Sequence, residues 1–173
     1  MTHGDADVLR SGMKLLLSSF GPPASHDQAL AELAGTAAPR DPAWLHRDAF
    51  EVYPDQMSLE EGRASLRSDG YVFELVDLRQ WREDKPGLRE LLSQFDAFLL
   101  AGGNPYYLRS LMRTTGADEL ITERVRDGAV YAGASAAAVV AGPTLRHFDE
   151  LDSPEEAEEV IWVGLGLTQI APD

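Results

Sequence analysis

The stretch VYAGASAAAVVAG, residues 130–142, passes from β-branched and aromatic residues through a glycine to a single serine among alanines. The first residue types favour a strand and alanine favours a helix, so the stretch predicts a strand over 129–133 and a helix over 136–141. Ser135 falls at the turn between them. A serine there can hold its hydroxyl clear of the backbone, while the N–H of Ala136 points toward a developing oxyanion. The simpler alternative is that Ser135 only caps the helix.

Strand-like and helix-like segments alternate on both sides of this stretch. Further strands are predicted over 14–18, 43–50, 71–78 and 95–103, and helices over 25–35, 58–70, 85–94, 104–116 and 117–128. Strands that alternate with helices at this spacing need right-handed crossovers, which give a mostly parallel sheet with helices on both faces. The predicted fold class is therefore α/β, a three-layer αβα sandwich.

The length of the chain favours a single domain. The 173 residues are enough for one well-buried core and too few for two. We expect one domain over 13–173, and residues 1–12, which are polar, to be a disordered N-terminal arm or a tag remnant. The sequence leaves a homodimer open.

The composition excludes several kinds of partner and chemistry. A formal net charge of −14 opposes contact with phosphate backbones or anionic lipid, so neither nucleic acid nor a membrane is expected as a partner. The polar N-terminus is not a secretory signal and no apolar run has membrane-spanning length, so a cytoplasmic protein is predicted. The chain has no cysteine. Any covalent catalyst must therefore be an oxygen or nitrogen nucleophile.

A glycine-rich loop, AGGN at 101–104, follows a neighbouring predicted strand. Its two glycines allow a sharp turn that presents backbone N–H groups beside a helix start. Ligands gather at the carboxyl ends of parallel strands, so this loop and Ser135 are predicted to form one acyl-transfer site. Gly102 or Gly103 would supply a second oxyanion donor, and we expect Asn104 and Tyr106 to contact the substrate.

Three quoted segments carry a resemblance to a known family. FLLAGGNPYYLRSLMRTTG (98–116) is similar to its GGN strand, loop and helix, VYAGASAAAVVAGPTL (130–145) to its nucleophile segment, and GLGLTQIAP (164–172) to its next strand. The family is the peptidase E (aspartyl dipeptidase) and cyanophycinase group of serine peptidases, which are relatives of class I glutamine amidotransferases.

The resemblance implies a class I glutamine amidotransferase-like fold with Ser135 as the nucleophile. It implies an oxyanion hole formed by the N–H groups of Ala136 and of Gly102 or Gly103. The implied activity is that of a serine-type peptidase, without a cofactor, that hydrolyses short peptides, Asp-containing ones among them.

Two positions depart from the family's pattern. Ala137 stands where the family usually has glycine, and Asp173 stands where its catalytic histidine follows a proline. A serine needs a base to become nucleophilic at neutral pH. Three alternatives stay open: a C-terminally truncated peptidase, a catalytically impaired binding or regulatory module, and amidotransferase-like acyl transfer on a small amide. His147, which has carboxylates around it in the sequence, is the candidate replacement base.

The remaining polar groups have less specific interpretations. No metal is predicted, because the other histidines lack metal-ligand spacing; they are His3, His26 and His46. The run 149–159 holds seven carboxylates, and a solvated loop is favoured over a calcium or cationic-substrate site. Arg109 and Arg113 share a helix face, for which a solvated face is favoured over a contact with a substrate carboxylate.

Overall fold

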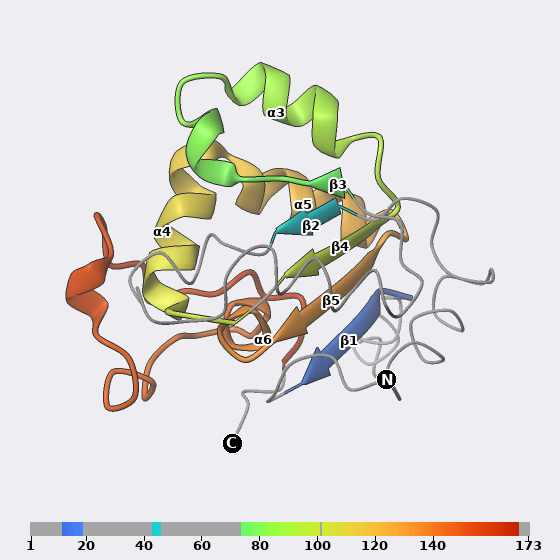
Figure 1. The fold of residues 1–173 in the computed structure, drawn as a ribbon. Helices are drawn as coiled ribbons and strands as arrows, with labels where there is room; N and C mark the ends of the chain where they lie inside the picture. Colours follow the sequence, from blue (N-terminus) through green and yellow to red (C-terminus); the bar gives the residue numbers. More distant parts are fainter. Residues whose placement is uncertain (1–11, 19–42, 46–73, 101, 170–173) are drawn as a thin grey trace, which may run out of the picture.

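The computed structural model of the chain describes residues 12–18, 43–45, 74–100 and 102–169, whose strands form one parallel sheet. The strand order is β1-β5-β4-β2-β3 (Figure 1). The strands are β1 (Lys14–Ser18), β2 (Ala43–Leu45), β3 (Glu74–Leu75), β4 (Ala97–Leu100) and β5 (Val130–Ala134). The register sets Ser18 opposite Ala134 and Leu100 opposite Gly133. The carboxyl ends of β1, β4 and β5 therefore lie side by side at one edge of the sheet.

The described helices begin and end where the sequence supplies caps. They are α3 (Lys85–Leu92), α4 (Pro105–Thr115), α5 (Ala117–Arg126) and α6 (Ala136–Ala141), with the 3₁₀ helices η1 (Leu78–Trp81) and η2 (Pro154–Glu156). The Asp84 carboxylate accepts a hydrogen bond from the Gly87 N–H at the start of α3. Gly116, at φ 79°, ends α4 in the left-handed conformation and leads directly into α5. None of the helices in this part of the chain is long and apolar enough to cross a membrane.

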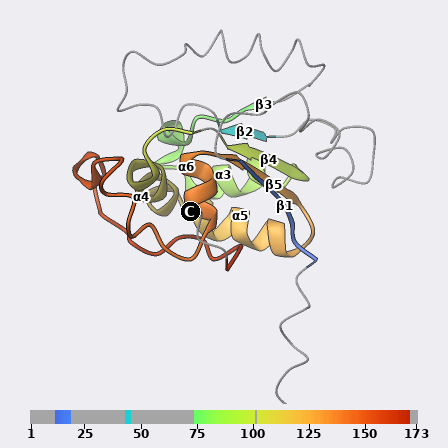
Figure 2. The ribbon, with the colours of Figure 1, turned by 90° about the horizontal axis from the view of Figure 1, so that it is seen from below.

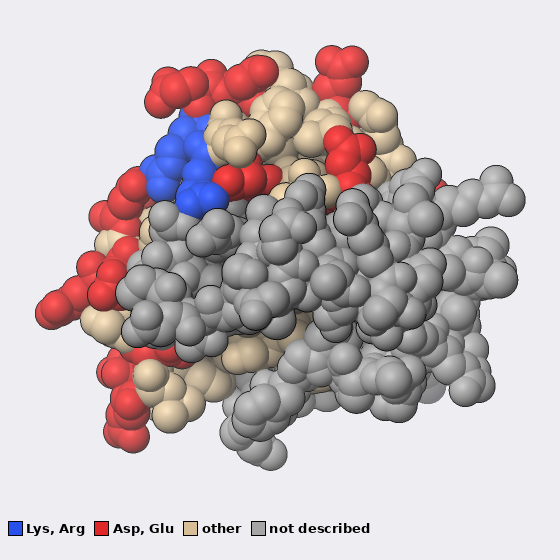
Figure 3. All heavy atoms as spheres, in the orientation of Figure 1, with Lys and Arg blue, Asp and Glu red and all other residues tan. Residues whose placement is uncertain are grey.

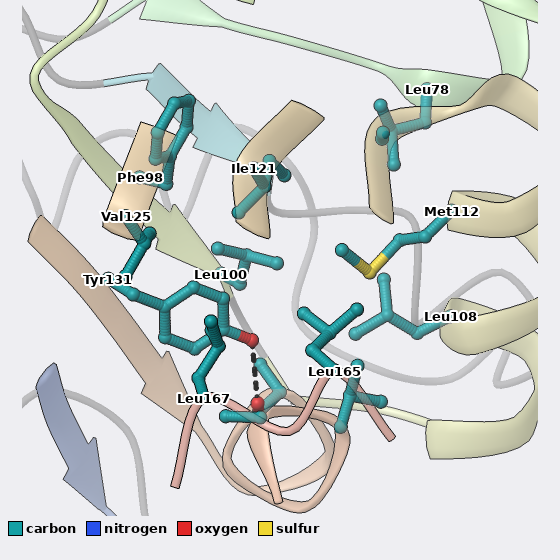
Figure 4. Packing of buried hydrophobic residues seen from close by; sticks show 14 of the residues in the cluster. Leu78, Phe98, Leu100, Leu108, Met112, Ile121, Val125, Tyr131, Leu165 and Leu167 are labelled. Carbon is teal, nitrogen blue, oxygen red and sulfur yellow. Dashed lines mark hydrogen bonds between the residues drawn. The ribbon is translucent and has the colours of Figure 1, made fainter. Parts of the chain in front are cut away.

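One hydrophobic core joins the sheet to these helices. Figure 2 shows α4, α5 and α6 on the same side of the sheet. Phe98 of β4 and Tyr131 of β5 have no exposed surface, and they pack in one cluster with Ile121 of α5 and Met112 of α4 (Figure 4). Burial of each such side chain contributes about 1.5–3 kcal/mol, so this layer fixes the helices on the sheet.

The predicted α/β class with a parallel sheet is confirmed. The predicted strand 14–18 has the observed bounds, whereas the prediction for 71–78 was too long at its C-terminal end: β3 ends at Leu75 and η1 begins at Leu78. The predicted helices 25–35 and 58–70 lie outside the described residues, as does the predicted arm apart from Gly12.

The segment GLGLTQIAP is not a strand over its described residues, so the predicted strand is wrong there. Residues 165–168 instead donate backbone hydrogen bonds of 2.8–3.3 Å to the last carbonyls of α6 and to Gly142; the pairs are Leu165 to Val140, Gly166 to Gly142, and Leu167 and Thr168 to Ala141. A Cβ at Gly164 would overlap the Gly142 carbonyl oxygen, so only glycine fits there. The last carbonyls of a helix have no partner within it, and residues 164–168, named here the capping segment, supply one for α6.

Asp77 shows how a charge stabilises the carboxyl end of the sheet. Its carboxylate accepts hydrogen bonds from the N–H, the Nε and the Nη2 of Arg79, at 3.1, 2.7 and 2.7 Å. Burial favours the protonated carboxyl, yet these hydrogen bonds and the Arg79 charge outweigh it and lower the pKa of Asp77 below 3.8. The stabilisation is therefore present above pH 3.8 and is lost as the pH falls through the lowered pKa.

We expect Asp77→Asn to lower the free energy of unfolding by about 1 kcal/mol at pH 7, because asparagine keeps the cap acceptor and loses the charge. The difference from the parent should shrink as the pH is lowered below 3.8, where the parent carboxylate becomes protonated. Urea unfolding at pH 7 and at several acidic values measures both. A difference that does not change with pH would show that the Asp77 charge contributes nothing.

Candidate functional site

Ser135 forms a strained turn between β5 and α6. Its backbone angles are φ 52° and ψ −116°, a conformation that glycine adopts readily and other residues rarely do. Such a conformation costs about 1–3 kcal/mol and persists only when the surroundings impose it. Here the Ser135 N–H donates to the Ser18 carbonyl at 2.8 Å, and the Ser135 carbonyl accepts from the N–H groups of Ala138 and Val139. The turn is therefore fixed from both sides.

The side chain of Ser135 is exposed and makes no hydrogen bond to the start of α6. The alternative in which Ser135 only caps the helix is therefore wrong. The strained backbone carries the hydroxyl away from the helix N–H groups that a capping serine would bind. This is the arrangement expected of a nucleophile on a strand-to-helix turn.

The glycine loop after β4 lies against this serine. A Cβ built on Gly102 would lie 3.0 Å from the Cβ of Ser135 and 3.4 Å from its Oγ. Gly103 has φ 117°, which a residue with a side chain rarely adopts. The sequence prediction that the two loops meet is therefore correct for the positions of Ser135 and Gly102. The bare backbone at Gly102 leaves the space beside the hydroxyl open.

Among the described residues, backbone N–H groups without a hydrogen-bond partner occur next to Ser135 in the chain and in the glycine loop that packs against it. In the described part of the chain, the N–H groups of Ala136, Gly102 and Gly103 donate to no acceptor. Unpaired N–H groups at a helix N-terminus and in a glycine turn are suited to stabilise a negative oxygen. Gly102 packs against Ser135 and Ala136 follows it in the chain, and the oxyanion hole at their N–H groups stays a prediction.

Close packing beneath the turn explains the residues around the serine. A Cβ at Gly133 would lie 2.7 Å from Cε1 of Tyr131 and 3.0 Å from the carbonyl carbon of Ala137, so β5 and α6 touch at this glycine. Ala137, the departure from the family's glycine, lies fully buried in α6 and is not among the residues with positive φ. Its Cβ therefore fits without backbone strain.

His147, the candidate base, is not hydrogen-bonded to Ser135. It is exposed, has φ 80°, and makes no hydrogen bond to the serine. Asp173 and the histidines His3, His26 and His46 lie outside the described residues. His147 is therefore the histidine that the structure describes, and no hydrogen bond joins it to Ser135.

Asn104 and Tyr106 occupy buried positions, where no side-chain surface is open to a substrate. The Asn104 side-chain oxygen accepts from the N–H groups of Tyr106 and Tyr107, which caps α4, and its Nδ2 donates to the Ser153 carbonyl at 2.9 Å. The Tyr106 hydroxyl donates to the Leu145 carbonyl at 2.8 Å. In this structure both side chains hold the loop after β4 in place.

Arg109 is buried, so the prediction of a solvated face is wrong for this residue. Its side chain is 4% exposed; Nη1 donates to the Asp118 carboxylate at 2.9 Å and Nε to the Val163 carbonyl at 2.9 Å. Arg113, which is half exposed, also contacts Asp118 at 3.1 Å. Burial lowers the pKa of Arg109, and the Asp118 charge opposes that effect. Arg109 thus ties α4 to α5 and to the residue before the capping segment.

The acidic run 149–159 is a turn-rich loop that contains η2. Its carboxylates are mostly exposed, and acidic side chains line the left edge in Figure 3, where Figure 1 places this loop. The loop is attached to α4 by a hydrogen bond from the N-cap residue Asn104 to the Ser153 carbonyl and by one from the Glu159 N–H to Ser110 Oγ at 3.2 Å. Within the described residues, no three metal-ligating side chains come together. The arrangement agrees with the predicted solvated loop.

Sequence reasoning missed two groups that shape the turn. The Ser18 carbonyl holds the Ser135 N–H, and the Tyr131 hydroxyl donates to the Ala137 carbonyl at 2.7 Å. Burial raises the pKa of Tyr131, so the hydroxyl stays protonated and remains a donor. The signal for Tyr131 was its position two residues before Gly133, because alternate residues of a strand share one face.

Comparison with known proteins places these features in a family. The sequence profile of peptidase family S51 matches residues 48–172. The uncharacterized peptidase Lin0382 of Listeria innocua is 32% identical over 102 residues, which are 59% of this chain and 48% of that protein. Peptidase E of Streptomyces coelicolor is 36% identical over 76 residues, 44% of this chain and 31% of that protein. A crystal structure of a Listeria monocytogenes EGD-e protein assigned to peptidase E superposes with a TM-score of 0.75 at 26% identity, covering 91% of this chain and 76% of that one.

These similarities confirm the resemblance that the glycine loop and the nucleophile segment predicted. The chain spans about half the length of the first curated relatives it matches, 48% and 47%. The profile nevertheless covers well over half of this chain, and the matched residues include the strained serine, the glycine loop and the capping segment. The chain belongs to peptidase family S51.

Proposed function

We propose that this chain carries the acyl-transfer site of a serine-type peptidase, with Ser135 as the nucleophile. The observation that carries the proposal is the conformation of Ser135, whose exposed hydroxyl stands on a strained turn beside Gly102. Ser135 Oγ attacks the peptide carbonyl carbon, and the carbonyl oxygen becomes an oxyanion near the N–H groups of Ala136 and of Gly102 or Gly103. The amine then leaves with a proton, and water hydrolyses the acyl-enzyme.

The reaction needs a base to accept the Ser135 proton. The family resemblance assigns this role to a histidine at the position of Asp173, and the sequence offers His147 as a replacement. If His147 is the base, it must form a hydrogen bond to Ser135 that is absent from this structure. His147→Ala tests whether His147 is the base. The variant should react more slowly if His147 accepts the Ser135 proton, and at the rate of the parent if another group accepts it.

The substrate class that we propose is a short peptide, Asp-containing ones included. The family resemblance supports this choice. A second candidate function is a binding or regulatory module of the same family, which the aspartate at the position of the family's histidine favours. Acyl transfer on a small amide would use the same serine, and glutamine or simple amides in place of dipeptides distinguish it from peptidase action.

A fluorophosphonate probe tests the proposal directly, because it phosphonylates only an activated serine. We expect the purified protein to gain one adduct, and peptide mapping by mass spectrometry to place it on Ser135. We also expect the same protein preparation to hydrolyse Asp-containing and other dipeptides. An unlabelled protein that hydrolyses nothing would contradict the peptidase and favour the binding module.

Gly102→Ala should slow this labelling roughly a hundredfold, because a new methyl group would stand 3.0 Å from the Ser135 Cβ and displace the reacting groups. The measurement is the rate of adduct formation by intact mass spectrometry, with thermal unfolding recorded in parallel. Gly12→Ala is the matched control, since a Cβ there meets nothing within 4 Å. Equal labelling rates in the two variants would place the reaction away from Gly102.

A further inference from the structure

Tyr131 lies directly beneath the turn that carries Ser135. Its ring has no exposed surface, and its hydroxyl donates a 2.7 Å hydrogen bond to the carbonyl of Ala137, the second residue of α6. Figure 4 shows this bond running from β5 to the helix, with the ring beside Leu100, Leu165 and Leu167 in the core. A side chain of the sheet therefore holds the helix by its first turn.

The strand is built to let this ring reach the helix. A Cβ at Gly133 would lie only 2.7 Å from the Tyr131 ring and 3.0 Å from the carbonyl oxygen of Ala137. Any larger residue at 133 would have to push the ring or the helix away. The absence of a side chain at Gly133 thus allows two contacts: α6 packs closely on β5, and the Tyr131 ring lies beside Gly133 and reaches the helix.

The first turn of α6 needs such support. The helix has six residues, which is too short to be stable by itself, and it follows a serine in a strained conformation. The capping segment holds the C-terminal end of α6. From the sheet, the Tyr131 hydroxyl makes a side-chain hydrogen bond to the N-terminal end of this helix. Without it, the first turn would keep the backbone hydrogen bonds of Ser135 and the contact at Gly133 but would lose the side-chain bond from the sheet.

We propose that Tyr131 is a positioning residue for the Ser135 nucleophile. Its hydroxyl fixes the Ala137 carbonyl, and through the first turn of α6 it fixes both the Ser135 Oγ and the Ala136 N–H that would face the oxyanion. Tyr131 touches no reacting atom. The inference rests on the proposed function, since it assigns a role within the same acyl-transfer site.

Tyr131→Phe tests the role, because it removes the hydroxyl and keeps the ring. Saturation kinetics with the fluorophosphonate separate the maximal rate of adduct formation from the probe concentration that gives half of it. We expect the maximal rate to fall about tenfold, with the half-saturating concentration unchanged. Amide hydrogen exchange should also accelerate over residues 136–139.

Thr115→Val is the matched control. The Thr115 hydroxyl is also buried and also donates to a backbone carbonyl, that of Leu111 at 2.9 Å, but it lies at the far end of α4. A comparable loss of stability is expected, with the maximal labelling rate of the folded protein unchanged. This comparison separates positioning of Ser135 from a general loss of stability.

The outcomes distinguish this inference from the function on which it rests. Labelling of the parent at Ser135, with an equal maximal rate in Tyr131→Phe, would overturn the positioning role and leave the peptidase intact. If the maximal rate falls equally in Thr115→Val, a general loss of stability explains the effect of Tyr131→Phe. That result would also overturn the positioning role. A parent protein that is never labelled would overturn the proposed function, and the positioning role with it.

Discussion

Ser135→Gly should make the protein more stable by about 1 kcal/mol and at the same time abolish fluorophosphonate labelling. The turn holds a serine at φ 52° and ψ −116°, where strain costs about 1–3 kcal/mol and glycine has none. Glycine gives back part of this gain, because it makes the unfolded chain more flexible by roughly 0.4–1 kcal/mol. The loss of the hydroxyl removes the nucleophile. Urea unfolding and intact mass spectrometry measure the two effects on one preparation.

Ser135→Ala is the matched variant for this experiment. Alanine lacks the hydroxyl but keeps the Cβ, so it should also abolish labelling without the gain in stability. The difference between the two variants therefore isolates the backbone strain from the chemistry of the side chain. If the glycine variant is no more stable than the alanine variant, the turn holds no strain. If either variant still gains an adduct, the reactive serine is a different one.

Arg109→Met should destabilise the protein by about 3 kcal/mol, the largest loss of stability expected from one side chain here. Arg109 and Asp118 are 4% and 5% exposed, so methionine would leave a buried carboxylate with only the half-exposed Arg113 as a partner. The Val163 carbonyl would lose its donor as well. Urea unfolding of the variant against the parent measures the change in the free energy of unfolding.

Two further variants complete that test. Arg89→Met breaks the exposed pair with Glu123, whose side chains are 58% and 56% exposed, and should cost less than about 0.5 kcal/mol. The double variant Arg109→Met with Asp118→Leu should recover stability relative to Arg109→Met, because no unpaired charge stays buried. A double variant less stable than the single one would show that packing, rather than the unpaired carboxylate, determines the loss.

Local pattern was enough to predict the parts of the fold that depend on neighbouring residues. The change from VYAG to AAAVVA predicted the turn at Ser135, and the paired glycines predicted a loop against it, because parallel strands bring such loops to one edge. The observed helix 136–141 has the predicted bounds. The strained turn at Ser135 is held by a hydrogen bond to Ser18, more than a hundred residues away, and no local pattern contains that contact.

The wrong predictions share a physical cause, which is a partner distant in sequence. The local sequence predicts that Arg109 is a solvated cation. In the fold, its side chain instead donates hydrogen bonds to Asp118 of α5 and to the Val163 carbonyl. Asn104 reads as a substrate contact until Ser153 accepts a hydrogen bond from its amide. The apolar residues Leu165 and Leu167 predict a strand. Their N–H groups instead donate to the carbonyls at the end of α6, which have no partner within that helix.

The capping segment sets an order of assembly for the chain during synthesis. A ribosome that has released residues 130–142 has delivered Ser135, but not the N–H groups of 165–168 that complete α6. Because a six-residue helix is too short to be stable by itself, we expect α6 and the strained turn before it to become stable only after some twenty-five further residues have emerged. A chain that ends before the capping segment is therefore expected to leave Ser135 in a relaxed conformation, and the proposed peptidase would gain its reactive serine only after residues 164–168 have been made.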